Sequence, residues 1–190
     1  MPKLLLRLLV ALIGTGLCCF LLRGPIYRSV VHYEVVRERG AVPSGIQAHG
    51  GKTPPVADIE ILIQAALDTT SAWLHFSTGK VLSDPRLLTA GSPANCVGYS
   101  ALCAALLKSE MGRSGLTARY QVQPVVAQLF IGHINLHAAF RSPFWKDHDI
   151  VRVRELATGH CTYLDPTLYD ASGIGEVRGI AHNTPAPHSE

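Results

Sequence analysis

Three residues of this 190-residue chain have side chains that can together carry out nucleophilic chemistry: Cys96, His148 and Asp165. A thiol attacks carbonyl groups as its thiolate, and an imidazole at hydrogen-bond distance takes up the thiol proton. A carboxylate that accepts from the other ring nitrogen fixes the tautomer and orientation of that imidazole. The three residue types therefore predict acyl chemistry at a thiol, provided that the fold brings them together.

Cys96 stands at the start of an expected helix. The segment CVGYSALCAALLKSEMG is apolar on nearly all sides, which is typical of a buried helix, and Gly112 or Gly115 is expected to end it. Asn95 is a suitable N-cap for this helix. A helix N-terminus offers partial positive charge and free amides, so it favours a thiolate and can hold the oxyanion that forms on an attacked carbonyl.

His148 and Asp165 lie near the ends of two expected strands. His148 opens the strand HDIVRVREL, and Asp165 closes the following strand, 17 positions further on. In an antiparallel pair with a turn around residues 157–159, these two ends lie side by side. Pro166 stiffens the backbone next to Asp165. His137 is the alternative base. It is further from Asp165 in the sequence than His148 is, so a longer connecting segment would have to bring it to Asp165.

The surrounding elements predict an α+β fold. Residues 56–76 carry apolar side chains at helical spacing, which predicts an amphipathic helix before the Cys96 helix. The segments TARYQVQPVVAQLF, HINLHAAF, DIVRVREL and CTYLDPTLY then alternate or run apolar over strand lengths. We therefore expect N-terminal helices packed on an antiparallel sheet. The domain is expected over residues 56–180, after a tether at 24–55 and before a disordered tail at 181–190.

The N-terminus predicts a membrane anchor or a signal peptide. In MPKLLLRLLVALIGTGLCCFLLRG, Lys3 and Arg7 precede a charge-free apolar run that ends at Arg23. The run approaches the length of a membrane span, about 20 residues. It lacks a small-x-small cleavage pattern, so an anchor over residues 1–23 is favoured over a cleaved signal or a buried helix. We expect the domain to lie outside the cytoplasm, either anchored or secreted.

Composition excludes few other functions. The net charge is +3, and the Lys and Arg residues are scattered without a basic stripe, so nucleic-acid binding is not expected. Outside the apolar N-terminal run the chain has three cysteines, Cys96, Cys103 and Cys161. Because three is odd, at least one of them stays a free thiol even where disulfides form.

Taken together, these segments resemble the transglutaminase-like superfamily of papain-fold thiol enzymes. NCVGYSALCAALLKSEMGRSGLTARY resembles the family's helix-starting Cys with the following Gly-x-x-Ala-Arg segment, and FWKDHDIVRVRELATGHCTYLDPT resembles its strand-opening His and Asp-Pro-Thr. The resemblance covers roughly residues 57–172. It implies a papain-like core in which Cys96 is the nucleophile, His148 the general base and acid, and Asp165 the orienting residue.

The expected function is therefore a thiol enzyme that acts on amide or ester carbonyls of a protein or peptide through an acyl-enzyme. Water resolves the intermediate in a peptidase or amidase, and an amine resolves it in a transglutaminase. This mechanism needs no cofactor and no metal. Two alternatives stay open: an inactive binding or scaffolding module at the membrane, and a zinc site. The ligands of such a zinc site would be His133, His137, His160 and Cys161.

Overall fold

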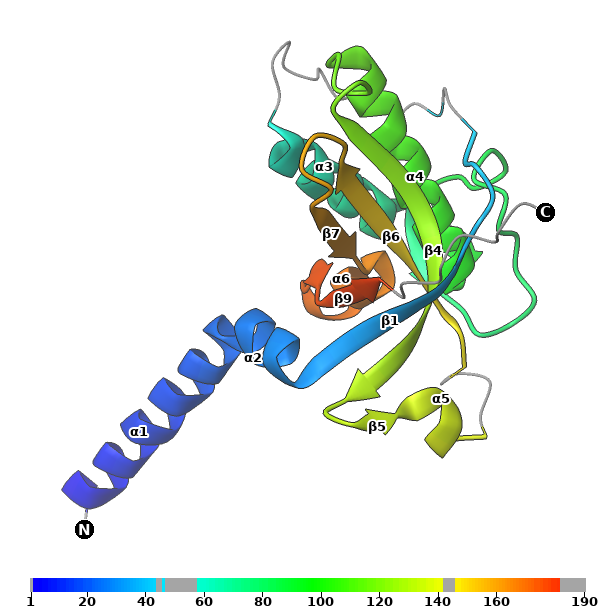
Figure 1. Ribbon diagram of the computed structural model, residues 1–190. Coiled ribbons are helices and arrows are strands. Elements are labelled where there is room, and N and C mark those ends of the chain that lie inside the picture. Colours follow the sequence, from blue (N-terminus) through cyan, green and yellow to red (C-terminus); the bar gives the residue numbers. More distant parts are fainter. Residues whose placement is uncertain (1, 44–45, 47–57, 142–145, 182–190) are drawn as a thin grey trace.

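The computed structural model describes residues 2–43, 46, 58–141 and 146–181. The helices are α1 (Pro2–Leu21), α2 (Arg23–Val30), α3 (Ile59–Trp73), α4 (Cys96–Arg113), α5 (Leu136–Ala139) and α6 (Pro166–Ser172). The strands are β1 (Val31–Glu38), β2 (Leu74–Phe76), β3 (Ser92–Ala94), β4 (Tyr120–Ile131), β5 (Ile134–Asn135), β6 (His148–Glu155), β7 (Cys161–Leu164), β8 (Glu176–Val177) and β9 (Gly179–Ala181). Helix α1 projects away from the body formed by the other elements (Figure 1).

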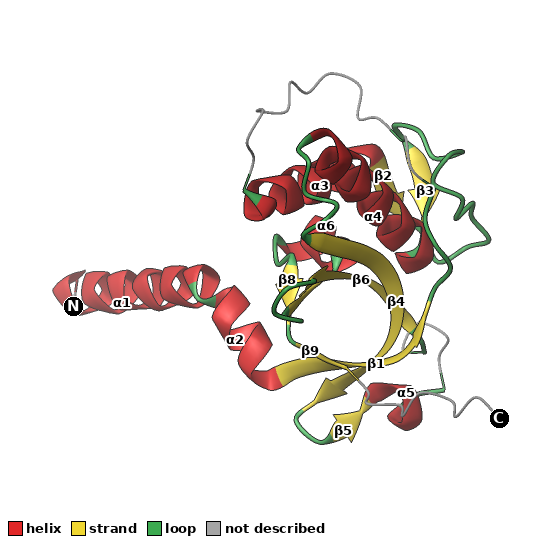
Figure 2. Ribbon diagram, turned by 45° about the horizontal axis from the view of Figure 1, so that its top comes forward, coloured by secondary structure: helices red, strands yellow, loops and turns green. Residues whose placement is uncertain are grey.

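One mixed sheet forms the centre of the fold and nearly closes into a barrel (Figure 2). Its strand order is β8-β7-β6-β4-β1-β9, with β5 paired to β4. All pairings are antiparallel except that of β1 with β9, where Tyr33 lies opposite Gly179 in a parallel register. A single residue, Arg178, separates β8 from β9, so the chain itself links the two ends of the sheet.

The expectation of a purely antiparallel sheet in a papain-like core is therefore wrong. The structure is α+β, but its sheet is mixed and barrel-like. The physical reason lies in the last two strands, which are only two and three residues long. Such short strands show no alternation of apolar and polar residues that a sequence pattern can reveal.

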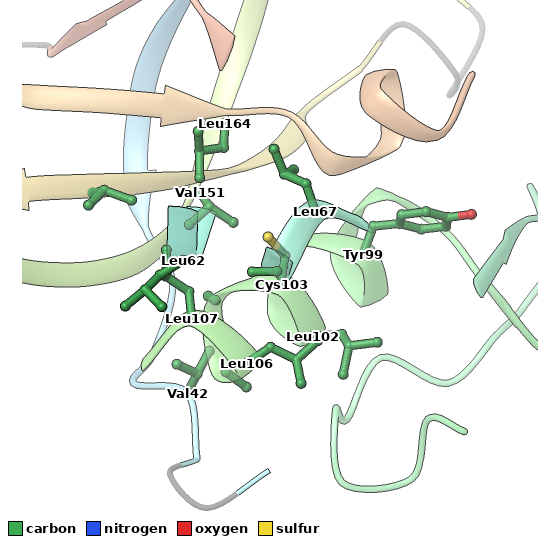
Figure 3. Close-up of a cluster of buried hydrophobic side chains, with 14 of the residues drawn as sticks. Val42, Leu62, Leu67, Tyr99, Leu102, Cys103, Leu106, Leu107, Val151 and Leu164 are labelled. Carbon is green, nitrogen blue, oxygen red and sulfur yellow. The ribbon is translucent and has the colours of Figure 1, made fainter. Parts of the chain in front are cut away.

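Helices α3 and α4 cover one face of the sheet, and both faces of β6 are buried. Val151 of β6 packs with the apolar side chains of α3 and α4 (Figure 3). Val153 belongs to the same cluster. Ile150 belongs to a second cluster on the other face, together with Tyr33 of β1. The amphipathic helix expected over residues 56–76 corresponds to α3, and the helix expected from Cys96 is α4.

Two of the expected strands contain helical turns instead. In HINLHAAF the strand β5 stops at Asn135, whose side chain accepts from the amides of His137 and Ala138 and caps α5. The strand expected over the whole of HINLHAAF is therefore wrong: β5 covers only Ile134–Asn135, and His137 lies in α5. In CTYLDPTLY the strand β7 ends at Leu164, and Pro166 begins α6. Proline is favoured at this first helical position because no amide is needed there.

The membrane anchor expected over residues 1–23 is also not supported, whereas the alternative of a signal peptide there stays a prediction. Among the helices of the described residues, none is long and apolar enough to cross a membrane. The sequence of α1 includes Gly14, Thr15 and Gly16, which divide its apolar run into two shorter parts. The location of the domain outside the cytoplasm stays a prediction.

Within the segment treated as a tether, residues 24–55, the structure forms most of α2 and all of β1. Strand β1 pairs with β4 along its whole length, from Val31 opposite Ile131 to Glu38 opposite Val125. Arg23 at the start of α2 donates to the carbonyl oxygen of Ser172 in α6 at 2.9 Å. The disordered tail was expected at residues 181–190, of which 182–190 lie outside the described residues.

Candidate active site

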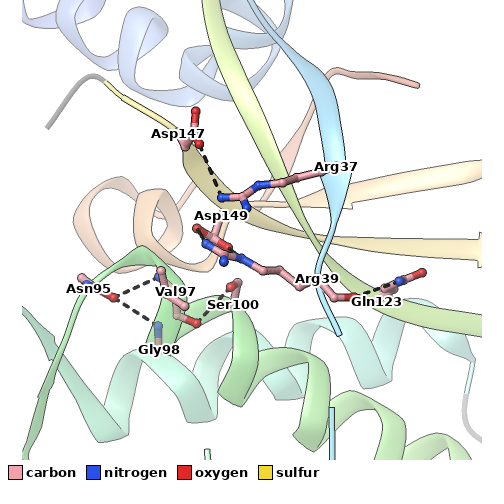
Figure 4. Close-up of polar contacts among 9 residues, drawn as sticks. All are labelled: Arg37, Arg39, Asn95, Val97, Gly98, Ser100, Gln123, Asp147 and Asp149. Atoms are coloured by element: carbon pink, nitrogen blue, oxygen red, sulfur yellow. Dashed lines mark hydrogen bonds and ion pairs between the residues drawn. The ribbon is translucent and has the colours of Figure 1, made fainter. Parts of the chain in front are cut away.

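Cys96 is the first residue of α4, and Asn95 caps the helix as expected (Figure 4). The Asn95 side chain accepts hydrogen bonds from the amides of Val97 at 3.1 Å and Gly98 at 3.3 Å. The cap therefore satisfies two of the amides that a helix start leaves free. Because these two serve the cap, the Cys96 amide is the candidate in the first turn for holding an oxyanion.

The strand pair β6–β7 brings His148 to Asp165. The two strands are antiparallel, with Val151 opposite Leu164, and both site residues lie beyond this pair at the same end. The distance from His148 Nε2 to Asp165 Oδ2 is 2.8 Å. The carboxylate is buried, whereas 25% of the His148 side chain is exposed. The imidazole thus stands between a buried anion and the solvent-accessible side of the site.

Four hydrogen bonds hold the Asp165 carboxylate. Oδ1 accepts from the amides of Thr167 at 3.1 Å and Leu168 at 2.9 Å, which makes Asp165 the N-cap of α6. Oδ2 accepts from His148 and, at 2.9 Å, from the Tyr33 hydroxyl. Burial alone raises the pKa of Asp165, but the charge of His148 and these hydrogen bonds outweigh burial and lower that pKa below its ordinary value. Asp165 is therefore a buried, ionised carboxylate.

His148 links Asp165 to Cys96. Burial lowers the pKa of His148, but the charge of Asp165 and hydrogen bonds to Asp165 and to the Cys96 side chain raise it well above its ordinary value. Because Nε2 faces Asp165, Nδ1 is the ring nitrogen left for the sulfur. The structure therefore brings the three predicted residues together in the order thiol, imidazole, carboxylate, and it favours a protonated imidazole beside the thiol.

Two tyrosines behind Asp165 were not found by sequence reasoning. Tyr33 is buried and donates its hydroxyl proton to Asp165, so the 2.7 Å contact with Tyr27 has Tyr27 as the donor. Burial raises the pKa of Tyr27 to about 12, and burial together with the charge of Asp165 raises that of Tyr33 still further. Both hydroxyls therefore stay protonated as donors. Tyr33 lies 132 positions from Asp165, and no sequence signal connects them.

The alternative base, His137, has a different partner. Its Nδ1 lies 3.2 Å from Asp147 Oδ1, without the geometry of a hydrogen bond. The structure places it in α5, whereas the histidine that is hydrogen-bonded to the Cys96 side chain is His148. Within the same described part of the chain, no group of three metal-ligating side chains comes together. His160 and Cys161, two other ligands of the zinc alternative, lie directly before β7 and at its first position, at the end of the β6–β7 ladder that is far from His148.

A hollow of about 540 Å³ lies between α3, the strand pair β6–β7 and residues 173–176. It is lined by Ile63, Tyr120 and His160 among others, and by none of Cys96, His148 and Asp165. This hollow is therefore separate from the candidate active site.

Comparison of the chain with protein-family models, with curated proteins and with solved structures finds no match.

Proposed function

We propose that this chain is a thiol enzyme that acts on amide or ester carbonyls through an acyl-enzyme, as do the transglutaminase-like enzymes that its sequence resembles. The observation that supports this most strongly is the geometry around His148. Its Nε2 is 2.8 Å from a buried carboxylate oxygen of Asp165, and Cys96 at a helix start is its other partner. A thiol, a base and an orienting group in this order are the parts that nucleophilic acyl transfer requires.

The proposed reaction begins when the Cys96 sulfur, as thiolate, forms a bond to the carbonyl carbon of the substrate. The carbonyl oxygen becomes an oxyanion, which the Cys96 amide can stabilise. The protonated His148 gives its proton to the leaving amine or alcohol as the bond to the carbonyl carbon breaks. Asp165 stays ionised throughout and holds the imidazole in place.

The acyl-enzyme is then resolved by water or by an amine. His148 takes a proton from the incoming nucleophile, and the bond between the Cys96 sulfur and the acyl carbon breaks. With water the products are those of a peptidase or amidase, and with an amine those of a transglutaminase. We propose a protein or peptide as the substrate, and we favour hydrolysis for a domain of this size.

The rate at which iodoacetamide labels Cys96 between pH 5 and 9 tests this proposal. We expect rapid labelling at about pH 6 in the wild type, because an imidazolium beside the sulfur stabilises the thiolate. His148→Ala should lower the rate at pH 6 by about tenfold or more, whereas His137→Ala should leave it unchanged. Slow labelling of Cys96 in all three proteins would favour the inactive scaffolding module instead.

The other cysteines supply the controls for this assay. Cys18, Cys19 and Cys161 are partly or fully exposed, so we would replace all three with Ser and confirm the labelled position by mass spectrometry. Cys103 stays in place as an internal control. It is buried, and burial raises its pKa to about 12, so labelling of Cys103 would reveal unfolded protein.

A further inference from the structure

A buried ion pair lies next to the candidate active site. The Arg39 guanidinium donates to Asp149 through Nε at 2.7 Å and through Nη2 at 3.1 Å. Only 1% of the Asp149 side chain is exposed, but 35% of the Arg39 side chain is exposed. The carboxylate is thus hidden behind the guanidinium, and the pair presents its positive end to solvent.

The position of this pair follows from the alternation of side chains along β6. Asp149 directly follows His148, so the two side chains point to opposite faces of the strand. Asp149 therefore shares the face of Val151, which packs against α4. Figure 4 shows Arg39 reaching from the region after β1 toward Asp149, over the first turn of α4 at Val97. This is the turn that begins with Cys96.

The electrostatics agree with this placement. The charge of Cys96, when it is a thiolate, is among the groups that raise the pKa of Arg39, after the hydrogen bond and the charge of Asp149. A neighbouring pair, Arg37 with Asp147, shows the contrast. Its atoms are 3.5 Å apart and its side chains are 57% and 39% exposed, so it presents both signs of charge to solvent.

We propose that Arg39 is a specificity-determining residue of the thiol site, and that its guanidinium binds a carboxylate carried by the acyl substrate close to the reacting carbonyl. This inference rests on the function proposed above. The bonds to Asp149 use Nε and Nη2, so the Nη1 side of the planar guanidinium can face a second carboxylate. The buried Asp149 fixes the orientation of the guanidinium before the substrate binds.

Two alkylating reagents of similar size test the proposal without a known substrate. Iodoacetate carries a carboxylate one bond from the carbon that Cys96 attacks, and iodoacetamide is its neutral counterpart. The measured quantity is the ratio of their labelling rates at Cys96. An attractive charge in the site raises the rate for iodoacetate alone, and added salt weakens this effect.

The variants must not leave a buried charge without its partner. Because Arg39→Gln alone would strand the buried Asp149, the test uses Arg39→Gln combined with Asp149→Asn, and separately Arg39→Lys. Arg119→Gln combined with Glu155→Gln is the matched control, because it also removes an arginine together with its paired carboxylate. This exposed pair lies at the opposite end of the β4–β6 ladder.

We expect the double variant to lower the ratio of iodoacetate to iodoacetamide rates about threefold to tenfold, because the lost guanidinium faces the site whereas the lost carboxylate is buried behind it. Arg39→Lys, and the control Arg119→Gln with Glu155→Gln, should keep the ratio within about twofold of the wild type. An unchanged ratio in the double variant, with normal iodoacetamide labelling, overturns the role of Arg39 and leaves the proposed function standing. A wild-type Cys96 that reacts with neither reagent overturns both.

Discussion

Replacing Asp165 with Asn removes one buried charge and leaves the shape of the side chain unchanged. Asn is a good N-cap, so the bonds from the amides of Thr167 and Leu168 to the remaining oxygen can persist. At the other oxygen, an amide group replaces the acceptor that now serves His148 at 2.8 Å and Tyr33 at 2.9 Å. The variant therefore removes the carboxylate charge and the acceptor of His148 and Tyr33 together, while the cap of α6 is kept.

The size of the effect follows from this geometry. An opposite charge at hydrogen-bond distance raises the pKa of an imidazole by about 1 to 3 units. We therefore expect the pKa of His148 to fall by about 1 to 3 units in Asp165→Asn, because burial, which lowers that pKa, is no longer outweighed by the charge of Asp165. The free energy of unfolding should fall by about 1–3 kcal/mol at pH 5, the scale of a hydrogen bond between charged groups.

The loss of stability should also depend on pH in a defined way. The raised pKa of His148 contributes stability that is complete below the unfolded pKa of about 6.5 and disappears as the pH rises through the folded value. The lowered pKa of Asp165 contributes stability that is complete above about pH 4 and disappears as the pH falls through the folded value. The difference between wild type and variant is therefore greatest between about pH 4 and 6.5.

Nuclear magnetic resonance titration of the His148 ring and urea unfolding at several pH values measure these two effects. Asp170→Asn is the matched control. It removes a carboxylate from the same helix, α6, where Asp170 accepts from Ser71 and Tyr99 at 2.7 Å and has no bond to His148. The reasoning is refuted if Asp165→Asn leaves the pKa of His148 within about 0.3 units of the wild type, or if the stability difference does not vary with pH.

Three further predictions concern two residues that support the site. Tyr33→Phe removes the buried hydroxyl that donates to Asp165, and urea unfolding at pH 7 should show a loss of about 1–3 kcal/mol; a loss below about 0.5 kcal/mol would contradict the hydrogen bond. Asn95→Ala removes the acceptor for the amides of Val97 and Gly98, so the same measurement should show a loss of about 1 kcal/mol. Asn95→Asp keeps that acceptor and should restore stability, but its added negative charge beside the thiolate should slow the labelling of Cys96 by iodoacetamide. Equal labelling of the Asn and Asp proteins would show that charge at this cap does not reach the sulfur.

Parts of the candidate site were predictable because the signals that specify them are local. The helix start at Cys96 follows from a capping residue, Asn95, directly before an apolar helical run. The approach of His148 to Asp165 follows from two short strands joined by a tight turn, where Gly159 adopts a positive φ of 73°. Both predictions depend on residues fewer than twenty positions apart, where turn and helix geometry decide the distance.

Other predictions failed where the local pattern permitted two structures. HINLHAAF reads as a strand, yet Asn135 caps a helical turn within it, because Asn and Asp side chains bind nearby amides and compete with sheet formation. CTYLDPTLY changes from strand to helix at Asp165 for the same reason. The membrane anchor was predicted from the apolar N-terminus alone, and the described helices do not support it.

The sequence by itself therefore determined that Cys96 begins a helix, that His148 begins a strand, and that Asp165 lies at the same end of the strand pair as His148. Only the tertiary structure decided that β1 joins the sheet beside β4 and nearly closes it with β9. That pairing brings Tyr33 to Asp165 across 132 positions and Arg39 to Asp149 across 110. Periodicity and capping act over one or two elements, whereas strand order depends on which faces of the whole sheet can be buried together.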